Sequence, residues 1–488
     1  MSNLTYATNA LIVCLVVAGN ALGAQQKAAH LGAATPELLS FTAFSFTAEG
    51  GKSTTADSTT LVAPMNRSRS GKATVNIPLV RFRSTSRSPG APIIYLSGGS
   101  GSGISAAAGP RFAFFQELRQ AGDVVVFDLR GAGRSRPRLG CSSDRPIPVG
   151  EALSYEALVS LLRRNARECS DSLRRAGVDL TGFNVRETVE DIDAIRRGLG
   201  ATQVRLVGIS TGSQIGLEYV RRYGRHLSHA VLAGIQGPDQ LIDLPSAQER
   251  VLRELSEQLG KTADSSAQSA VPDLFGVAQS VIKALGSNPA TVRIQDRRSG
   301  DSVTVHLGAL DAQVLISATL GNRKQMQILP AVFGAAARGD YAPLAAFKSE
   351  ASRSGINSAF EALQDCQTGV SAARLAGRAS EARTSLLGWG TLDFPEHCDG
   401  WGVPKLDGSW RKPVQSAASV LLISGTLDGR TSVRNAEAVL LGLRNGMHLV
   451  VEGASHGDDL FLSTTDISRV ILSFLRGRTA RELRAEVQ

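Results

Sequence analysis

Short apolar runs alternate with amphipathic segments of helical spacing, and this alternation limits the possible folds more than any other feature of the chain. Such runs are typical of strands buried on both faces, as in a parallel sheet that helices cover. The strand-like runs are 91–96, 123–127, 204–210 and 228–235, and the helical patterns are 111–122, 155–175, 185–200 and 212–224. We therefore predict an α/β fold with a mostly parallel central sheet and helices on both faces. Alternating stretches in residues 31–83 predict antiparallel strands at one edge.

The strand pattern stops near Leu241 and returns near Pro413. The residues between them are mostly amphipathic and helical in spacing, as in 246–260 and 328–347. Two further strand-like runs and a helical pattern follow, at 419–425, 447–451 and 466–477. One α/β core interrupted by a helical cap explains this order better than two independent domains. The predicted divisions are residues 25–240 and 413–488 for the core, and 241–412 for the cap.

The N-terminus has the pattern of an export signal. Residues 10–19 form an apolar run that is too short to span a bilayer, and the small residues Gly23 and Ala24 follow it. We predict a signal peptide over residues 1–24, cleaved near Gly23-Ala24. The mature protein would then be periplasmic or secreted, with no stable membrane insertion. The alternative is a buried N-terminal strand.

The formal net charge is +9, which is compatible with an anionic partner. The arginines are spread over several helical patterns, including Arg163, Arg164, Arg167, Arg174, Arg175, Arg221, Arg222 and Arg225. This spread is typical of a solvated basic surface, so no nucleic-acid partner is predicted. The sequence leaves the oligomeric state open.

A serine stands between two glycines at Gly208-Ile209-Ser210-Thr211-Gly212, after an apolar run and before a helical pattern. In a tight strand-to-helix turn, small residues two before and two after the serine let strand and helix approach each other. The strained turn exposes the hydroxyl group. We interpret Ser210 as a nucleophile. The alternative is a chance match in a chain with 50 glycines.

A nucleophilic serine needs a base and an acid that orients the base. Asp428 follows one strand-like run and His456 follows the next, so both are predicted at strand ends in the order serine, acid, histidine. We predict a Ser210–His456–Asp428 triad. Asp458 and Asp459 follow His456 too closely to lie on a separate strand. Surface or structural roles are expected for the remaining histidines, which are His30, His226, His229, His306, His397 and His448.

The negative oxygen of an acyl-transfer intermediate needs two backbone donors. Thr211 N–H is the first candidate, because it follows the nucleophile. The glycine-rich loop after residues 91–96 supplies the second, with Gly99 N–H preferred and Gly98 beside it. The rival interpretation is a phosphate-binding loop, whose G-x-x-x-x-G-K-[ST] pattern is absent. The predicted chemistry requires no metal and no organic cofactor.

Signal cleavage would leave four cysteines, Cys141, Cys169, Cys366 and Cys398. Export permits disulfides, and no C-x-x-C pattern indicates zinc. Pairing the neighbours, Cys141 with Cys169 and Cys366 with Cys398, is one of three possible connectivities. Four reduced thiols are the alternative.

Taken together, these motifs resemble the proline iminopeptidase branch of the α/β-hydrolases, and most closely its exported tripeptidyl-aminopeptidase-like members. The resemblance covers about residues 60–475. It implies an α/β-hydrolase fold, the triad named above and a cap over the site. Cys366 and Cys398 fall where those members carry a cysteine pair. The similar motifs are YLSGGSGSG, FDLRGAGRSRPRLGC, ETVEDIDAIRRGLG, LPAVFGAAARGDY and GTLDGRTSV.

Within the second motif, Asp128, Arg130 and Ser135 are expected to hold the loop beside the site, through a buried contact between Asp128 and Arg130. Several positions depart from the family pattern, namely Ser97, Ser100, Thr211, Ala233 and Ser432. The family's peptidases bind the substrate's amino group with acidic residues, and the sequence alone assigns that role to no residue here.

Three functions follow from these observations. The first is an exported serine aminopeptidase that releases short peptides or single residues from peptide N-termini. The second, suggested by the departures, is a carboxyl-ester, lactone or amide hydrolase acting on a small molecule with the same triad. The third is a non-catalytic binding protein. A carboxylate in the cap facing Ser210 would favour the peptidase.

Overall fold

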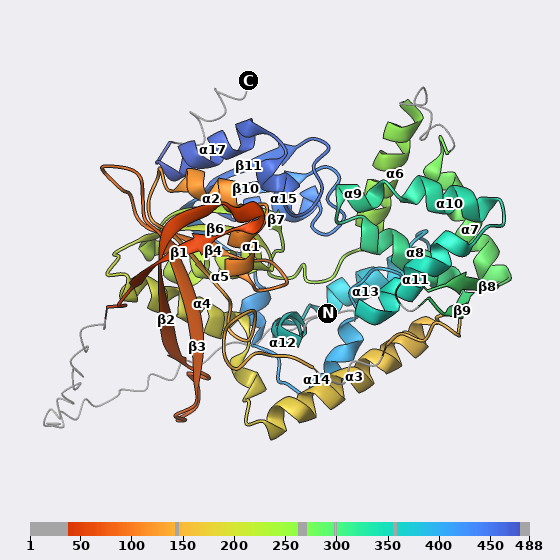
Figure 1. Ribbon diagram of the computed structural model, residues 1–488, viewed down its shortest axis with the longest axis horizontal. Coiled ribbons are helices and arrows are strands. Elements are labelled where there is room, and N and C mark those ends of the chain that lie inside the picture. Colours follow the sequence, from red (N-terminus) through yellow and green to blue (C-terminus); the bar gives the residue numbers. More distant parts are fainter. Residues whose placement is uncertain are drawn as a thin grey trace, which may run out of the picture. The chain divides into compact units, whose positions relative to one another are not determined.

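The computed structural model describes residues 38–141, 146–261, 271–296, 298, 300–354 and 359–478. The predicted signal peptide, residues 1–24, lies outside this range. From Leu38 onward the chain forms one compact unit built around a nine-stranded sheet (Figure 1). In spatial order its strands are β1 (Thr42–Thr47), β2 (Ser53–Pro64), β3 (Thr74–Phe82), β5 (Val124–Phe127), β4 (Ile93–Leu96), β6 (Val204–Ser210), β7 (Leu227–Ile235), β10 (Ser416–Gly425) and β11 (Leu443–Val451).

Most of the sheet is parallel. Strands β5, β4, β6, β7, β10 and β11 pair in parallel, whereas β1, β2 and β3 form an antiparallel edge that joins β5. The predicted α/β class and the predicted antiparallel edge are both confirmed. Because the parallel strands all end at the same edge, the loops after β4, β6, β10 and β11 are brought together there.

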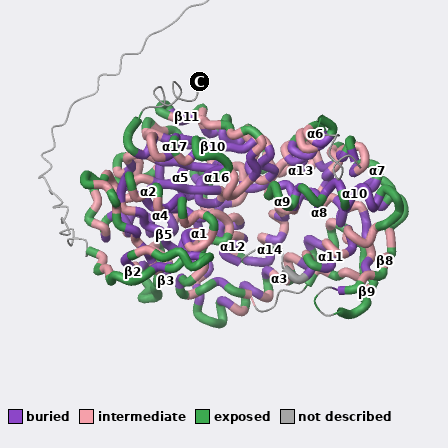
Figure 2. The backbone as a smooth tube through the Cα atoms, turned by 45° about the horizontal axis from the view of Figure 1, so that its top comes forward, coloured by how far each residue is buried: buried purple, intermediate pink, exposed green. Residues whose placement is uncertain are grey.

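Successive side chains of a strand point to opposite faces, and β4 shows this directly. Ile93 and Tyr95 join one apolar core with α2 (Phe112–Leu118) and α17 (Thr465–Leu475). Ile94 and Leu96 join the other core with α4 (Val185–Gly198) and α5 (Thr211–Tyr223). Figure 2 shows the buried strands between these helices. Helices therefore cover both faces of the sheet, as predicted.

The other helices that precede β7 are short or lie at the edge of the core. They are α1 (Gly103–Ala108) and α3 (Tyr155–Arg175). Within the core's C-terminal part lie α15 (Val433–Leu440) and α16 (Asp459–Leu462).

Between β7 and β10 the chain is mostly helical. The helices are α6 (Pro245–Lys261), α7 (Leu274–Ser287), α8 (Ala309–Thr319), α9 (Arg323–Met326), α10 (Leu329–Ala337), α11 (Ala342–Ser354), α12 (Ala359–Thr368), α13 (Ala372–Glu381) and α14 (Cys398–Trp401). A hairpin of β8 (Ala290–Gln295) and β9 (Ser302–Leu307) interrupts them, and the sequence analysis did not predict it. Its alternation is short and half exposed, which weakens the strand signal. We call this helical segment the cap; its boundaries at 241 and 412 remain a prediction.

The cap has its own apolar core and contacts the loops at the carboxyl edge of the sheet. Leu252, Leu315 and Phe333 belong to this core. After α8, the Leu320 carbonyl accepts a hydrogen bond from Gly429 N–H at 3.0 Å, and Arg323 N–H donates to Ser455 Oγ at 3.0 Å. The cap therefore touches the loop after β10 and the loop after β11.

The structure confirms both neighbouring cysteine pairings. Cys141 is bonded to Cys169 in α3, and Cys366 in α12 is bonded to Cys398 in α14, with Cα–Cα distances of 5.2 and 5.3 Å. Disulfides of this kind persist in oxidising compartments. Among the described residues, no helix has the length and apolarity needed to cross a membrane.

The predicted contact between Asp128 and Arg130 is wrong. Arg130 is buried and forms its ion pair with Asp191 in α4 at 2.7 Å. Asp128 instead accepts backbone hydrogen bonds from Ile104 and Arg134, at 3.0 and 2.8 Å. A carboxylate can be satisfied by backbone N–H groups as well as by a guanidinium, so sequence proximity did not identify the partner. Both side chains still fix the loop after β5.

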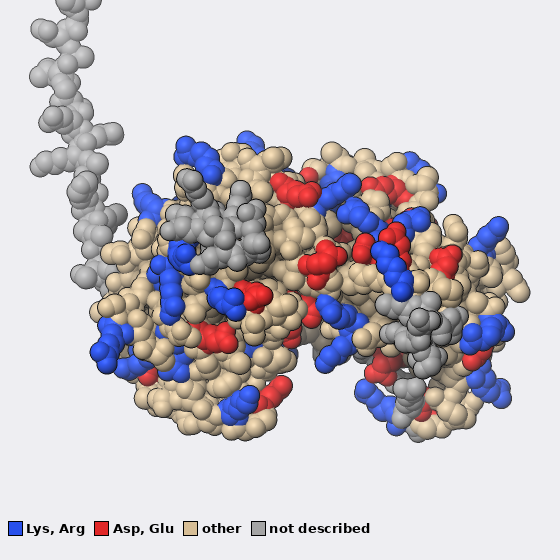
Figure 3. All heavy atoms as spheres, turned by 90° about the horizontal axis from the view of Figure 1, so that it is seen from above, with Lys and Arg blue, Asp and Glu red and all other residues tan. Residues whose placement is uncertain are grey.

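On the face seen in Figure 3, Lys and Arg side chains lie scattered among Asp and Glu. This view agrees with the spread of arginines along the sequence.

Candidate active site

Ser210 ends β6 and precedes α5 in a strained turn. Its φ of 56° and ψ of −126° make it the one residue other than glycine with positive φ among those described. A Cβ on Gly208 would lie 2.7 Å from the Gly212 carbonyl oxygen, and one on Gly212 would collide with the Leu96 carbonyl at the end of β4. The two glycines therefore permit the turn, and they bring it against β4.

This packing places the glycine-rich loop after β4 beside the serine. A Cβ on Gly98 would lie 3.2 Å from the Cβ of Ser210, and a side chain on Gly99 would occupy the space of the Glu361 carboxylate. Thr211 is buried and is the first residue of α5, so its N–H belongs to the donors that no helix carbonyl accepts. The predicted oxyanion-hole residues therefore surround Ser210. Their role remains a proposal.

Asp428 lies in the loop after β10 and is buried. Its Oδ1 accepts the backbone N–H groups of Arg430 and Thr431, both at 2.8 Å. Its Oδ2 accepts a hydrogen bond from Thr431 Oγ1 at 2.7 Å and lies 2.8 Å from His456 Nδ1. Burial alone would raise the pKa of Asp428, but the charge and hydrogen bond of His456 and the hydrogen bonds of Thr431 outweigh burial and lower it.

His456 follows β11, and the Asp428 contact fixes its ring through Nδ1. This leaves Nε2 for proton exchange at the serine. Thr431 Oγ1 lies 3.2 Å from His456 Nδ1 and so contacts both the acid and the ring. Among the described residues, no hydrogen bond joins Ser210 Oγ to His456, and such bonds are often long in ligand-free sites. The sequence analysis missed Thr431, which stands three residues after Asp428 in the resembling motif GTLDGRTSV.

The competing acids are bonded elsewhere. Asp458 Oδ1 pairs with Arg111 Nε at 2.6 Å, and Asp459 Oδ2 accepts Ser455 Oγ at 2.7 Å. Neither is bonded to His456 among the described contacts.

Ser210, His456 and Gly99 line two cavities at once. The larger, of about 740 Å³, extends beneath the cap, and the smaller, of about 350 Å³, lies over the glycine-rich loop and the loop after β11. The larger has the size of a site for a small molecule or short peptide. The candidate nucleophile and base thus lie where the two cavities meet.

Six carboxylates from the cap line the larger cavity, and none of them was predicted from the sequence. They are Asp243, Glu361, Asp365, Asp393, Glu396 and Asp399. Burial raises the pKa of Glu361, and the charge of Asp393 raises it further, against the opposing charges of Arg430 and His456. The influence of His456 on Glu361 shows that the group lies beside the triad.

Asp243 and Asp365 experience the same two effects. Burial and then the charge of Asp393 raise the pKa of Asp243 well above its usual value. Burial and the charges of Glu361 and Asp393 do the same for Asp365, whose buried Oδ1 has no hydrogen-bond partner among the described residues. A group of acids held together against their mutual repulsion favours a cationic ligand.

One signal in the sequence could have identified two of these acids. Glu361 and Asp365 are four residues apart, so they share one face of α12. Like charges at this spacing destabilise a helix, which makes the pair a sign of function.

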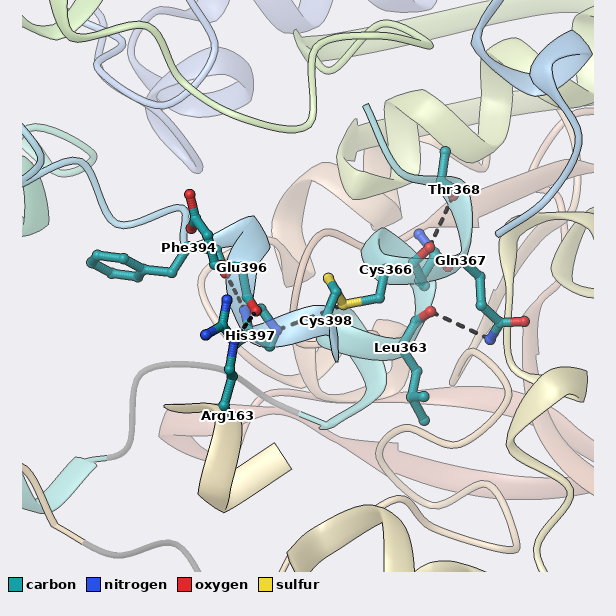
Figure 4. The surroundings of a disulfide bond; sticks show 10 residues. Arg163, Leu363, Cys366, Gln367, Thr368, Phe394, Glu396, His397 and Cys398 are labelled. Carbon is teal, nitrogen blue, oxygen red and sulfur yellow. Dashed lines mark hydrogen bonds between the residues drawn. A yellow bond between two sulfur atoms is a disulfide. The ribbon is translucent and has the colours of Figure 1, made fainter. Parts of the chain in front are cut away.

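The Cys366–Cys398 disulfide forms part of the wall of the larger cavity (Figure 4). It joins α12, which carries Glu361 and Asp365, to the turn that carries Glu396 and His397. The bridge therefore fixes the two parts of the acidic wall relative to each other.

His397 is buried in this wall, with Nδ1 against the Phe394 carbonyl and Nε2 3.7 Å from Cys366 Sγ. Burial lowers its pKa, so the ring is neutral near pH 7. Cys366, His397 and Cys398 bring their ligand atoms within 4.8 Å of one another. Since thiolates, not disulfide sulfurs, bind metals, the bonded pair offers no metal site.

Two curated proteins are similar to parts of this chain. Serine protease Hip1 of Mycobacterium tuberculosis is 28% identical over 188 residues, which are 37% of this chain and 36% of that protein. Tripeptidyl aminopeptidase of Streptomyces coelicolor is 29% identical over 161 residues, 31% of this chain and 28% of that protein. The chain thus matches about a third of the length of these curated relatives.

Among solved structures, proline iminopeptidase of Mycobacterium smegmatis is similar with a TM-score of 0.38 at 14% identity, covering 88% of this chain and 100% of that one. The model of the alpha/beta hydrolase fold family matches residues 91–456, which include the strand-end loops that carry Ser210, Asp428 and His456. The chain therefore belongs to the alpha/beta hydrolase fold family.

Proposed function

We propose that this hydrolase is a serine aminopeptidase that releases short peptides from the N-termini of peptide substrates. The observation that carries the proposal is the group of six cap carboxylates in the same cavity as Ser210 and His456. A protonated α-amino group would stabilise the charged forms of Asp243, Glu361 and Asp365, which burial and neighbouring acids disfavour.

The proposed reaction proceeds through an acyl-enzyme. Ser210 Oγ attacks the scissile carbonyl carbon while His456 Nε2 takes its proton, and His456 then gives that proton to the leaving amine. Asp428 holds the ring by the 2.8 Å contact to Nδ1 and stabilises the imidazolium. The N–H groups of Thr211 and Gly99 stabilise the negative oxygen, and water then releases the acyl group.

The larger cavity suggests the length of the released product. Its volume of about 740 Å³ exceeds what a single residue needs, and apolar residues line it along with the acids. If the amino group is held at the carboxylates, the space between them and Ser210 accommodates a short peptide. The names of the two curated relatives, a serine protease and a tripeptidyl aminopeptidase, support this choice.

A second candidate is hydrolysis of a carboxyl ester, lactone or amide of a small molecule. The apolar side of the same cavity favours it, through Leu241, Leu375, Trp389 and Phe394. The triad chemistry is the same for both candidates.

Activity on paired substrates tests the proposal. Purified protein and Ser210→Ala are assayed on tripeptide p-nitroanilides with a free or an acetylated amino group, and on p-nitrophenyl esters. We expect turnover of the free-amino peptides, at least tenfold weaker turnover after acetylation, and loss of both with Ser210→Ala. Turnover of esters alone would refute the aminopeptidase and support the second candidate.

We also propose that the protein is exported. The two disulfides support this, because they form in oxidising compartments. Mass analysis of the mature protein from its native host tests the predicted cleavage near Gly23-Ala24. An intact N-terminus would refute it.

A further inference from the structure

The smaller cavity is not explained by the binding of an amino terminus. It has a volume of about 350 Å³ and shares Gly99, Ser210 and His456 with the larger cavity. Its other lining residues come from the glycine-rich loop, from α1, from the turn before α2, from the end of β6 and from the loop after His456. Most of them are small, and one, Arg111, carries a guanidinium.

The geometry of acyl transfer restricts what this cavity can hold. The tetrahedral carbon on Ser210 carries an oxyanion, an acyl group and a leaving group, which point in three different directions. With the oxyanion at Thr211 and Gly99 and the acyl group beneath the cap, the leaving group must lie on the remaining side. His456 must also reach the leaving nitrogen, and residues 456–458 line the smaller cavity.

Arg111 is held rigidly at this cavity. Its Nε donates to Asp458 Oδ1 at 2.6 Å, and its Nη1 contacts the Tyr95 hydroxyl group. The guanidinium also lies over the ring of Phe461, at 5.3 Å from its centroid. A group fixed by three neighbours loses little conformational entropy when it binds a ligand.

The guanidinium retains donors for a ligand. It has five N–H groups, and the contacts with Asp458 and Tyr95 use two of them. The described residues provide no acceptor for the other three. The Arg111 side chain is only 14% exposed and lines the smaller cavity, so these three N–H groups can meet a ligand only in that cavity. Donors in such a place are satisfied by water or by the oxygen of a ligand.

We propose that the smaller cavity is the leaving-group site and that Arg111 binds the first backbone carbonyl or carboxylate oxygen of the departing peptide. This proposal rests on the proposed function for the acyl-enzyme on Ser210, for the peptide leaving group and for the direction of the substrate. Its ligand is the amino component of the reaction, a peptide or amino acid whose nitrogen lies at His456. The side chains that line the smaller cavity, such as Ser105 and Ala106, are small, so we expect little selectivity for the side chain of the first residue of the departing peptide.

The partitioning of one acyl-enzyme tests the site directly. The protein is acylated with a p-nitrophenyl ester or a peptide p-nitroanilide, and glycylglycine, glycinamide or propylamine is added as an acceptor. Chromatography measures the ratio of the aminolysis product to the hydrolysis product. This ratio does not depend on the rate of acylation. We expect capture by glycylglycine and glycinamide to saturate, and capture by propylamine, which has no carbonyl, to stay weak and linear.

Arg111→Gln is expected to raise the half-saturating concentration of both carbonyl-bearing acceptors about tenfold, in line with the loss of a charge-assisted hydrogen bond. Arg119→Gln is the matched control. Arg119 lies at the other end of α2, donates to the Arg83 carbonyl at 2.7 Å and lines neither cavity. It is expected to leave partitioning as in the wild type.

Two results would overturn the proposal. One is a wild type that captures propylamine as well as glycylglycine. The other is an Arg111→Gln variant with unchanged partitioning, or with an equal loss for all three acceptors, which would indicate a structural role. If that variant does not fold, Ala106→Phe fills the cavity from α1 and should lower capture of glycylglycine relative to hydrolysis; unchanged capture would refute the site.

The two proposals fail in different ways. Acylation by esters but not by free-amino peptides would refute the aminopeptidase and leave the partitioning experiment valid. A Ser210 that no donor acylates would refute both.

Discussion

Asp428, which contacts His456, and the cap carboxylates, which line the larger cavity, differ in their hydrogen bonding. Asp428 accepts four hydrogen bonds from Arg430, Thr431 and His456, and its pKa is lowered despite burial. Asp365 keeps a buried oxygen with no partner among the described residues, and burial together with neighbouring acids raises its pKa.

This difference separates two uses of a buried acid. The protein itself supplies the donors that keep Asp428 charged, so its position is fixed before any substrate arrives. At Asp365, among the described residues, the donors are incomplete, so a cationic ligand can supply what is missing. The predictions below test this contrast, from the largest expected effect to the smallest.

The largest effect is expected from removing the charge of Asp428. Asp428→Asn should lower kcat about 10⁴-fold on peptides and esters alike, because the histidine loses its orientation and the stabilisation of its cation. Steady-state kinetics with both substrates checks this. Asp466→Asn, at an exposed position of α17 that pairs with Arg469, is the control and should stay close to the wild type. A loss below a hundredfold for Asp428→Asn would contradict the assignment.

The cap acids should instead affect binding of one substrate class. Glu361→Gln keeps the shape of the side chain and removes its charge. We expect KM for a free-amino peptide to rise about 10- to 100-fold, the range for a lost hydrogen bond to a charged group. The ratio of KM values for the free-amino peptide and an ester without an amino group is the measurement. An equal rise for both substrates would show that Glu361 acts on the catalytic groups instead.

The pH dependence of KM should reveal the raised pKa values. A carboxyl is neutral below its pKa, whereas the substrate's amino group stays protonated below about pH 8. As pH falls through the raised pKa of Glu361 and Asp365, KM for free-amino peptides should therefore rise. KM for the ester should not follow this rise. If KM for the ester rises at low pH in the same way as KM for the free-amino peptide, the carboxylates are excluded as the cause of the rise.

A smaller effect is expected at Thr431, which supports the acid and the ring together. Thr431→Val removes the hydroxyl that donates to Asp428 and keeps the branched shape. We expect kcat to fall about 3- to 10-fold, as for loss of one supporting hydrogen bond. Thr431→Ser retains the hydroxyl and should restore most of the activity. Failure of the serine variant to do better than valine would argue for a packing role.

The smallest effect concerns stability. For Asp365 the native pKa lies above the unfolded value, so its charge costs stability as pH rises from about 4 through the native pKa. Asp365→Asn should therefore stabilise the protein by about 1 kcal/mol near pH 7.5, with no gain near pH 4. Asp428→Asn should destabilise the protein near pH 7.5, because a native pKa below the unfolded value contributes stability that is present above about pH 4. Urea unfolding at the two pH values checks both signs.

The sequence by itself determined the sheet, its helical layers and the sequence positions of the candidate triad. In apolar runs such as 204–210, residues are suited to burial on either face of the sheet. The glycines around Ser210 permit the turn in which its φ is 56°. Asp428 and His456 were predicted in loops after two strands, and they do lie in the loops after β10 and β11, which end at one edge of the sheet.

Only the tertiary structure decided which side chains complete the site. The partner of Arg130 lies 61 residues away in α4, and the acidic wall comes from cap residues far apart in the sequence, including Asp243, Glu361 and Asp393. Contacts between distant segments depend on how helices without a shared sheet pack together. Local periodicity carries no information on that packing, so charge clusters and cavities emerged only when the chain was folded.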